Sequence, residues 1–76
     1  MNKLSYRIIL RPEPEGGYTV TVPTLPGCIT YGETLEQAKI MALDAIKVYL
    51  ESLKKHNEPI IDDSDILEGT LSIQFA

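Results

Sequence analysis

A single stretch between Thr34 and Pro59 has the spacing of a long amphipathic helix, and the rest of this 76-residue chain must pack against it. Thr34 and Gln37 match a capping box, in which the two side chains satisfy free backbone N–H groups at the helix start. Asn57 suits the left-handed residue that follows a helix, and Pro59 prevents the helix from continuing. We therefore predict a helix over residues 35–56.

Three segments, residues 3–11, 18–22 and 70–76, alternate apolar and polar residues, which is typical of half-buried strands. Residues 28–31 are short, β-branched and aromatic, and we predict a further strand there. The predicted order is β-β-β-α-β, with three antiparallel strands and a fourth strand that lies parallel to the first through a right-handed crossover. We expect an α+β fold of two layers, with one helix on one face of a four-stranded sheet. The length allows a single domain over residues 1–76.

The predicted helix carries more apolar surface than this core needs. Its apolar arc covers roughly 220°, against the roughly 100° stripe of an ordinary surface helix. Met41 and Val48 widen the arc on one side, and Leu43 and Leu50 widen it on the other. Either a small domain wraps its helix deeply, or these flanks contact a second subunit. The second interpretation predicts a homodimer or a tetramer.

The outer face of the predicted sheet is polar. It is either a solvated face, as antiparallel sheets often have, or a docking surface with an edge that pairs by strand addition. The residues expected to line it are Thr19, Thr21, Thr30, Thr70, Ser72 and Gln74, together with Arg7 and Arg11.

Charge and residue chemistry exclude several functions. The net charge is −4, whereas non-specific nucleic-acid binding needs clustered Lys and Arg. Cys28 has no base near it in the sequence, and the only histidine, His56, is expected at the far end of the helix, so a Cys–His nucleophile is disfavoured. We expect Cys28 to pack as a small hydrophobic residue. One cysteine and one histidine cannot close a zinc site, and residues 62–65 lack the glycine and the distal glutamate of a calcium loop. We expect no metal, no cofactor and no catalytic residue.

The location of the protein is also suggested by the sequence. A lone cysteine fits a reducing compartment, and the first residues contain no apolar signal region. No run approaches the roughly 18 apolar residues of a membrane span. We therefore expect a cytoplasmic protein that does not contact a membrane.

The segment VPTLPGCITYGETLEQA, residues 22–38, resembles the signature of the HicB family, the antitoxin half of HicA–HicB toxin–antitoxin pairs. The flanking hairpin and the helix ending in YLESL fit as well, so the resemblance covers essentially the whole chain. We expect Leu25 to Gly27 to set a turn before the third strand, while a role of the motif in partner recognition stays open. The matching residues are Pro23, Leu25, Pro26, Gly27, Cys28, Gly32, Thr34 and Ala38.

The resemblance implies a partial ribonuclease H-like fold and a binding partner. Members of the family bind HicA, a small basic ribonuclease, and mask its active site. Ribonuclease H chemistry needs carboxylates on the central strands, and residues 3–11 contain none, which disfavours an enzyme. Many relatives carry a further DNA-binding domain. This sequence resembles the short, single-domain HicB-like proteins of UPF0150 type, so we expect no direct DNA binding.

Two functions follow as expectations. The first is an antitoxin that neutralises a HicA-like ribonuclease, and the second is an orphan oligomerisation or interaction domain without a toxin. If a toxin exists, we expect acidic loops to attract it through electrostatics. The candidate partner-binding residues are Glu13 and Glu15 in the first hairpin loop, and Asp62, Asp63, Asp65 and Glu68 in the loop after the helix.

Overall fold

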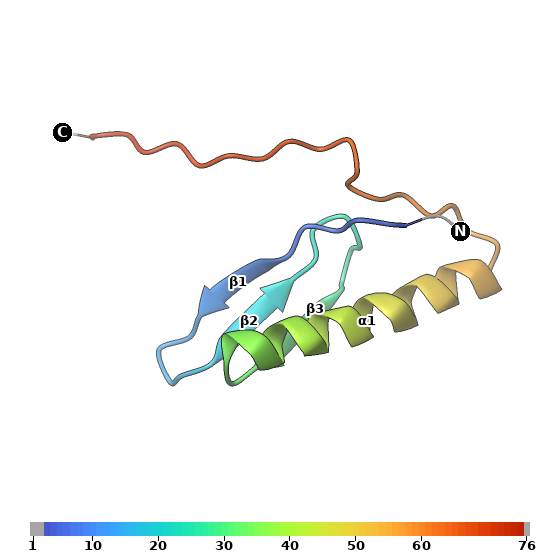
Figure 1. Cartoon of the computed structure of the whole chain (residues 1–76), viewed down its shortest axis with the longest axis horizontal. Coiled ribbons are helices and arrows are strands. Elements are labelled where there is room, and N and C mark those ends of the chain that lie inside the picture. The colour runs from blue at the N-terminus through green and yellow to red at the C-terminus, as the bar shows by residue number, and fades with distance from the viewer. Residues whose placement is uncertain (1–2, 76) are drawn as a thin grey trace.

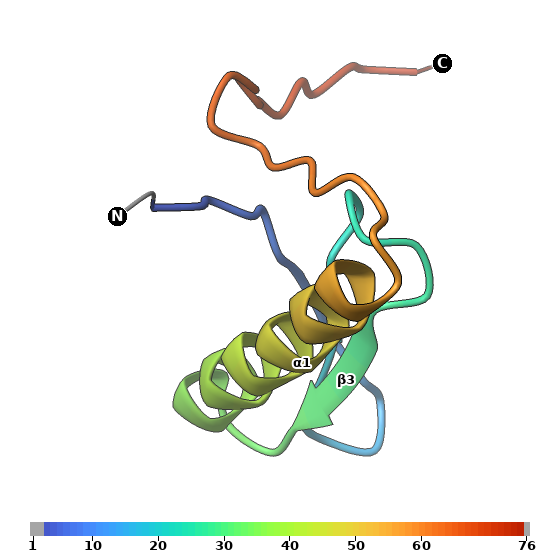
Figure 2. The same ribbon diagram turned by 90° about the vertical axis from the view of Figure 1, so that its right-hand side faces the viewer.

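The structure, a computed structural model, describes residues 3–75 as an α+β fold of two layers (Figure 1). Three strands precede one helix, as predicted: β1 Ile9–Pro12, β2 Tyr18–Thr21, β3 Ile29–Gly32 and α1 Leu35–Lys55. The strands form one antiparallel sheet in the order β1-β2-β3. The helix packs on one face of that sheet, over β3 and β2. Figure 2 shows α1 lying against β3.

The first hairpin closes through a tight turn. The amide of Glu13 donates to the carbonyl of Gly17 at 2.9 Å, and Gly16 donates back to Glu13 at 2.9 Å. Gly16 and Gly17 have φ of 109° and 78°, a region that glycine enters without steric penalty. This turn sets the register in which Arg11 lies opposite Thr19.

The Pro-Gly motif forms a second turn, between β2 and β3. Val22 donates to Cys28 at 3.0 Å, and Leu25 and Cys28 close two smaller turns by donating to Val22 and Leu25 at 3.0 and 2.9 Å. Gly27 has φ of 80°. The turn presses Leu25 and Cys28 into the core, where they are 2% and 5% exposed. The expected turn and the packed cysteine are both confirmed.

The core consists of two small clusters between the sheet and the helix. Val20 packs with Ala38 and Ala42 of the helix in one cluster. Val22, Leu25 and Cys28 form the other. Alanine at the helix contact lets the two layers approach closely, and this approach also explains Gly32. A Cβ atom on Gly32 would lie 2.4 Å from the Cα and the backbone N of Ala38.

The helix ends are capped nearly as predicted. The Thr34 hydroxyl accepts from the amide of Gln37 at 3.0 Å. The Gln37 side chain accepts from the amide of Glu33 at 2.6 Å, one residue earlier than a capping box requires. At the other end Asn57 has φ of 55°, and the amide of Glu58 donates to Leu53 at 2.9 Å, which closes the helix.

The predicted fourth strand is wrong for the single chain. Residues 67–75 run clear of the body without pairing to the sheet, so the sheet formed within residues 3–75 has three strands (Figure 1). Ala76, part of that prediction, lies outside the described residues. The ribonuclease H-like comparison depended on the fourth strand, and it stays a prediction.

Two further details of the sheet differ from expectation. The predicted first strand starts at residue 3, but β1 begins only at Ile9. Before it, the backbone groups of Ser5 and Arg7 form hydrogen bonds with Asp63, in the segment after the helix. Thr30 lies opposite Val20, so it shares the helix-facing side of the sheet. Ile29 and Tyr31 lie on the outer face instead of Thr30. The outer face is therefore less polar than predicted.

Candidate protein-interaction surface

A groove lies between β3 and the flank of α1. β3 pairs only with β2 within the described chain, so its other edge is open along this groove. The groove has a volume of about 710 Å³, and we call it the β3 groove. Its lining residues are Gly27, Cys28, Ile29, Thr30, Met41, Asp44, Ala45, Val48, Tyr49 and Ser52.

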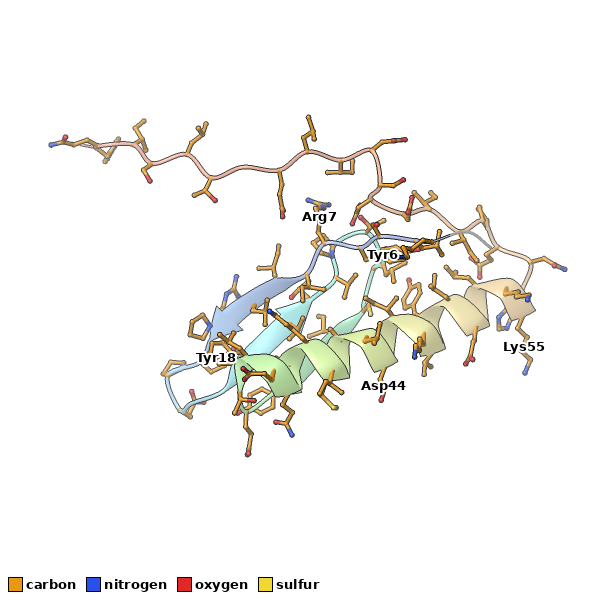
Figure 3. The ribbon with its side chains drawn as sticks, viewed as in Figure 1. Tyr6, Arg7, Tyr18, Asp44 and Lys55 are labelled. Atoms are coloured by element: carbon orange, nitrogen blue, oxygen red, sulfur yellow. The ribbon has the colours of Figure 1, made fainter. Side chains whose placement is uncertain are left out.

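The walls of the β3 groove are apolar, and the described residues of this chain leave them exposed. Met41 is 41% exposed and Val48 66%. Asp44 stands at the outer rim and points away from the sheet, as Figure 3 shows. Contiguous apolar surface with a polar rim is characteristic of protein–protein contacts. The β3 groove therefore has the features of a docking surface.

Deep wrapping of the helix does not account for its wide apolar arc. Met41 and Val48 line the β3 groove, and Leu43, on the opposite flank, is 55% exposed. Of the four flanking residues only Leu50 is half-buried, where it packs against the second core cluster. The contact with a second subunit that we inferred from these flanks stays a prediction.

A second polar feature ties the segment after α1 to the residues before β1. Asp63 is 6% exposed, and its carboxylate accepts from the amide of Arg7 at 2.9 Å and from the hydroxyl of Thr24. The Arg7 Nε lies 3.4 Å from the same carboxylate, and Figure 3 shows Arg7 directed toward the segment that follows α1. The amide of Asp63 also donates to the carbonyl of Ser5 at 2.8 Å.

Asp62 and Tyr6 extend this attachment. The carboxylate of Asp62 accepts from the amide of Ser5 at 2.9 Å, and the Tyr6 hydroxyl donates to the carbonyl of Ile61 at 2.8 Å. The hydrogen bond from the backbone amide of Ser5 lowers the pKa of Asp62, and the hydrogen bond from the backbone amide of Arg7 lowers the pKa of Asp63. These two aspartates are structural attachments of the chain to itself.

The acidic residues predicted to contact a partner therefore differ in their exposure to solvent. The expectation for Asp63 is corrected, because its carboxylate is buried and hydrogen-bonded within the chain and is not an exposed charge that a partner could meet. Glu13 is half-buried and accepts from the Thr19 hydroxyl. Glu15, Asp65 and Glu68 are exposed. The hairpin loop and the loop after the helix lie at opposite ends of the body in Figure 1, so they do not form one patch.

Most of the motif residues have structural roles, in the core, at the helix cap or in the turn. Leu25, Cys28, Gly32 and Ala38 are buried, Thr34 caps the helix, and Gly27 takes the left-handed turn position. Tyr49 of the helix donates to the carbonyl of Pro26 at 2.8 Å, which holds the turn against α1. Pro23 and Pro26 are exposed beside it.

The lone cysteine and the lone histidine have separate surroundings. Burial raises the pKa of the Cys28 thiol, which disfavours the reactive thiolate. The His56 Nδ1 lies 2.8 Å from the carbonyl of Ser52 at the end of its own helix. No group of three metal-ligating side chains occurs in residues 3–75, and no helix in that range is long and apolar enough to cross a membrane.

The sequence predicted only part of the β3 groove and did not predict the attachment at Asp63. Met41 and Val48 were visible as excess apolar surface on the helix, but their position beside the open edge of β3 could be seen only once the helix was packed on the sheet. The attachment of Asp63 to Arg7 joins residues 56 positions apart, and no local signal in the sequence indicates it.

A two-layer α+β fold with an open apolar groove has the features of a small protein-interaction module. Comparison with known families makes the identity more specific. The model of the family described as HicB-like antitoxin of bacterial toxin–antitoxin system matches residues 6–75, and the chain belongs to this family. The resemblance drawn from residues 22–38 is confirmed.

Individual relatives agree with this assignment. The chain is 48% identical over 61 residues to a UPF0150 protein of Thermoplasma acidophilum, an alignment that covers 80% of this chain and 88% of that protein. It is 40% identical over 60 residues to Antitoxin HicB 1 of Photorhabdus laumondii, covering 79% of this chain and 39% of the relative. It is 37% identical to Antitoxin HicB of Escherichia coli K12, covering 92% and 55%. The chain thus spans about half or less of the two named antitoxins.

Proposed function

We propose that this protein is a non-catalytic antitoxin that binds a small basic ribonuclease of HicA type and neutralises it by masking its active site. The observation that carries the proposal is the family match over residues 6–75, together with relatives named Antitoxin HicB. The alternative is an interaction domain without a toxin, and it is favoured by the relatives that are named only as UPF0150 proteins.

The charge of the chain suits such a partner. A ribonuclease presents Lys and Arg to RNA phosphates, and a protein with net charge −4 is attracted to the same surface. Glu13, Glu15, Asp65 and Glu68 act in this proposal as steering charges spread over both ends of the molecule. They raise the association rate, and they contribute less to the final affinity.

The β3 groove supplies the apolar contact that steering charges cannot. Its walls are exposed in the single chain, so covering them removes apolar surface from water at about 25 cal/mol per Å². We place the toxin in this groove, with its basic residues beside Asp44 at the rim. The toxin's active site is then blocked by the bulk of the antitoxin.

The direct test is neutralisation of a purified toxin. A small basic protein encoded beside this gene is purified, and its cleavage of a messenger RNA is followed while this chain is added. The proposal expects cleavage to stop near equimolar addition. A chain that binds no such ribonuclease would favour the orphan domain, and a chain that binds one without reducing cleavage would contradict masking of the active site.

A matched pair of variants tests the location. Val48 and Ile40 are 66% and 64% exposed on the same helix, but only Val48 lines the β3 groove. Val48→Lys is expected to weaken toxin binding at least tenfold, about 1.4 kcal/mol, because it places a cation against a basic partner. Ile40→Lys is expected to bind within about twofold of the wild type. Equal effects of the two substitutions would remove the β3 groove from the binding surface.

A further inference from the structure

The segment after the attachment at Asp63 has the composition of a buried strand but pairs with no strand in residues 3–75. Apolar and polar residues alternate from Thr70 to Phe75. The apolar side chains Leu71, Ile73 and Phe75 are 99%, 87% and 92% exposed. Such a pattern fits a strand with one face in a core.

The dimensions of the molecule confirm that this segment stands off the body. The radius of gyration is 14.6 Å, whereas a compact chain of this length has about 11 Å. The accessible surface is 6502 Å², against about 4,700 Å² for a compact 8.5 kDa protein. The excess, about 1,800 Å² per chain, is as large as the whole surface buried in a standard protein–protein interface.

A vacant strand position lies beside β1. β1 pairs only with β2 in the described chain, and α1 covers β2 and β3 and leaves the β1 side of the inner face open. Ile8 and Leu10 on that side are only half-buried. Leu43, on the helix flank opposite the β3 groove, is 55% exposed. An unpaired edge with apolar side chains along it is a site for strand addition.

We propose that residues 70–75 of one copy of this chain pair with the β1 edge of a second copy, and that the exchange is reciprocal. Leu71, Ile73 and Phe75 then extend the inner face of the partner's sheet, over its exposed β1 side. Ser72 and Gln74 face outward. Each sheet gains a fourth strand from the other chain, so the dimer is closed by a two-fold axis.

The path of the chain selects a second copy as the occupant. Ser5 and Arg7 fix Asp62 and Asp63, and a turn in which Ile66 donates to Asp63 at 2.9 Å directs the following residues away. Both views show the segment running clear of its own β1 (Figures 1 and 2). Residues 69–75 and residues 8–10 carry no charge, so the two acidic chains meet where neither repels the other.

The first test compares two variants of the full chain by light scattering and far-UV circular dichroism. Leu71→Asp/Ile73→Asp places charges on the face that enters the partner, and Ser72→Asp/Gln74→Asp places the same charges on the outward face. We expect wild type and the outward variant to have twice the 8.5 kDa chain mass, and the inward variant to be a helical monomer. A monomeric wild type at 100 μM, or equal masses for the two variants, overturns the proposal.

The second test decides the outcome if the inward variant does not fold. In a Cys28→Ala background, one chain carries Ile9→Cys and a co-expressed chain carries a cysteine at position 70, 72 or 74. Neighbouring strands lie about 4.8 Å apart, within the Cα range of a disulfide. One of the three pairs is expected to form a covalent dimer on oxidation. If both cysteines are placed in one chain and yield an internally linked monomer, or if no pair links, the exchange does not occur.

Discussion

Gly32→Ala tests the close packing of the sheet on the helix. Gly32 ends β3, and the site of its absent Cβ lies 2.4 Å from the Cα and the backbone N of Ala38 and 2.9 Å from the Ala38 Cβ. The obstructing atoms are mainly backbone, so no side-chain rotation relieves the clash. The helix must move by about 1 Å to restore an ordinary contact of 3.4 Å.

The expected loss of stability follows from this displacement. Overpacking of a core by one carbon typically costs about 1–3 kcal/mol. For a domain of this size, each kcal/mol lowers the melting temperature by roughly 4–8 °C. We expect Gly32→Ala to melt roughly 4–24 °C below the wild type, with the helical signal retained at low temperature.

Gly69→Ala provides the matched control. No atom lies within 4 Å of the Cβ it would add, and we expect a stability change within about 0.5 kcal/mol. Both variants are unfolded by heat and by urea at one protein concentration, since self-association makes the melting temperature concentration-dependent. If Gly32→Ala melts within 2 °C of Gly69→Ala, the contact between Gly32 and Ala38 does not limit the packing.

Three further predictions concern the cysteine and the acidic residues. Cys28→Ala is expected to lower the free energy of unfolding by roughly 1–2 kcal/mol and to leave partner binding intact; rapid labelling of native Cys28 by a thiol reagent, with loss of binding, would contradict this. The folded-state pKa values of Asp62 and Asp63 lie below their unfolded values. Their contribution to the stability of the fold is therefore present above about pH 4 and is lost as the pH falls through the folded pKa. The free energy of unfolding of Asp63→Asn in urea should depend less on pH in that acidic range than that of the wild type. Glu13→Lys/Glu15→Lys is expected to slow association with a basic toxin and to flatten its salt dependence, as stopped-flow mixing across a salt series would reveal.

The local elements could be predicted because their signals are local. Thr34, Asn57 and Pro59 fix the ends of the helix through contacts within a few residues. The turns at Gly16 and Gly27 need positive φ, and glycine at these positions marks them in the sequence. The antiparallel order of the first three strands follows from the short turns between them.

The remaining features depend on contacts between distant residues. The alternation from Thr70 to Phe75 predicted a strand that the single chain does not form, and periodicity does not specify which edge, or which copy, such a segment could pair with. The burial of Asp63 depends on Arg7 and Thr24, which lie far from it in the chain. The loop composition suggested a solvated acidic surface, and a single carboxylate turned inward reverses that interpretation for Asp63.

The two proposed contacts use opposite edges of one sheet, which makes them separable. The strand order β1-β2-β3 places the edge for strand exchange at β1 and the β3 groove at the other side. A dimer formed through β1 therefore leaves both β3 grooves free, and it binds two toxins. If Leu71→Asp/Ile73→Asp is a folded monomer, we expect each chain to bind one toxin with the same sensitivity to Val48→Lys as the wild type. Isothermal titration gives that stoichiometry per chain directly. Loss of toxin binding in the folded monomer would show instead that the toxin contacts both chains of the dimer, and that its site is completed by self-association.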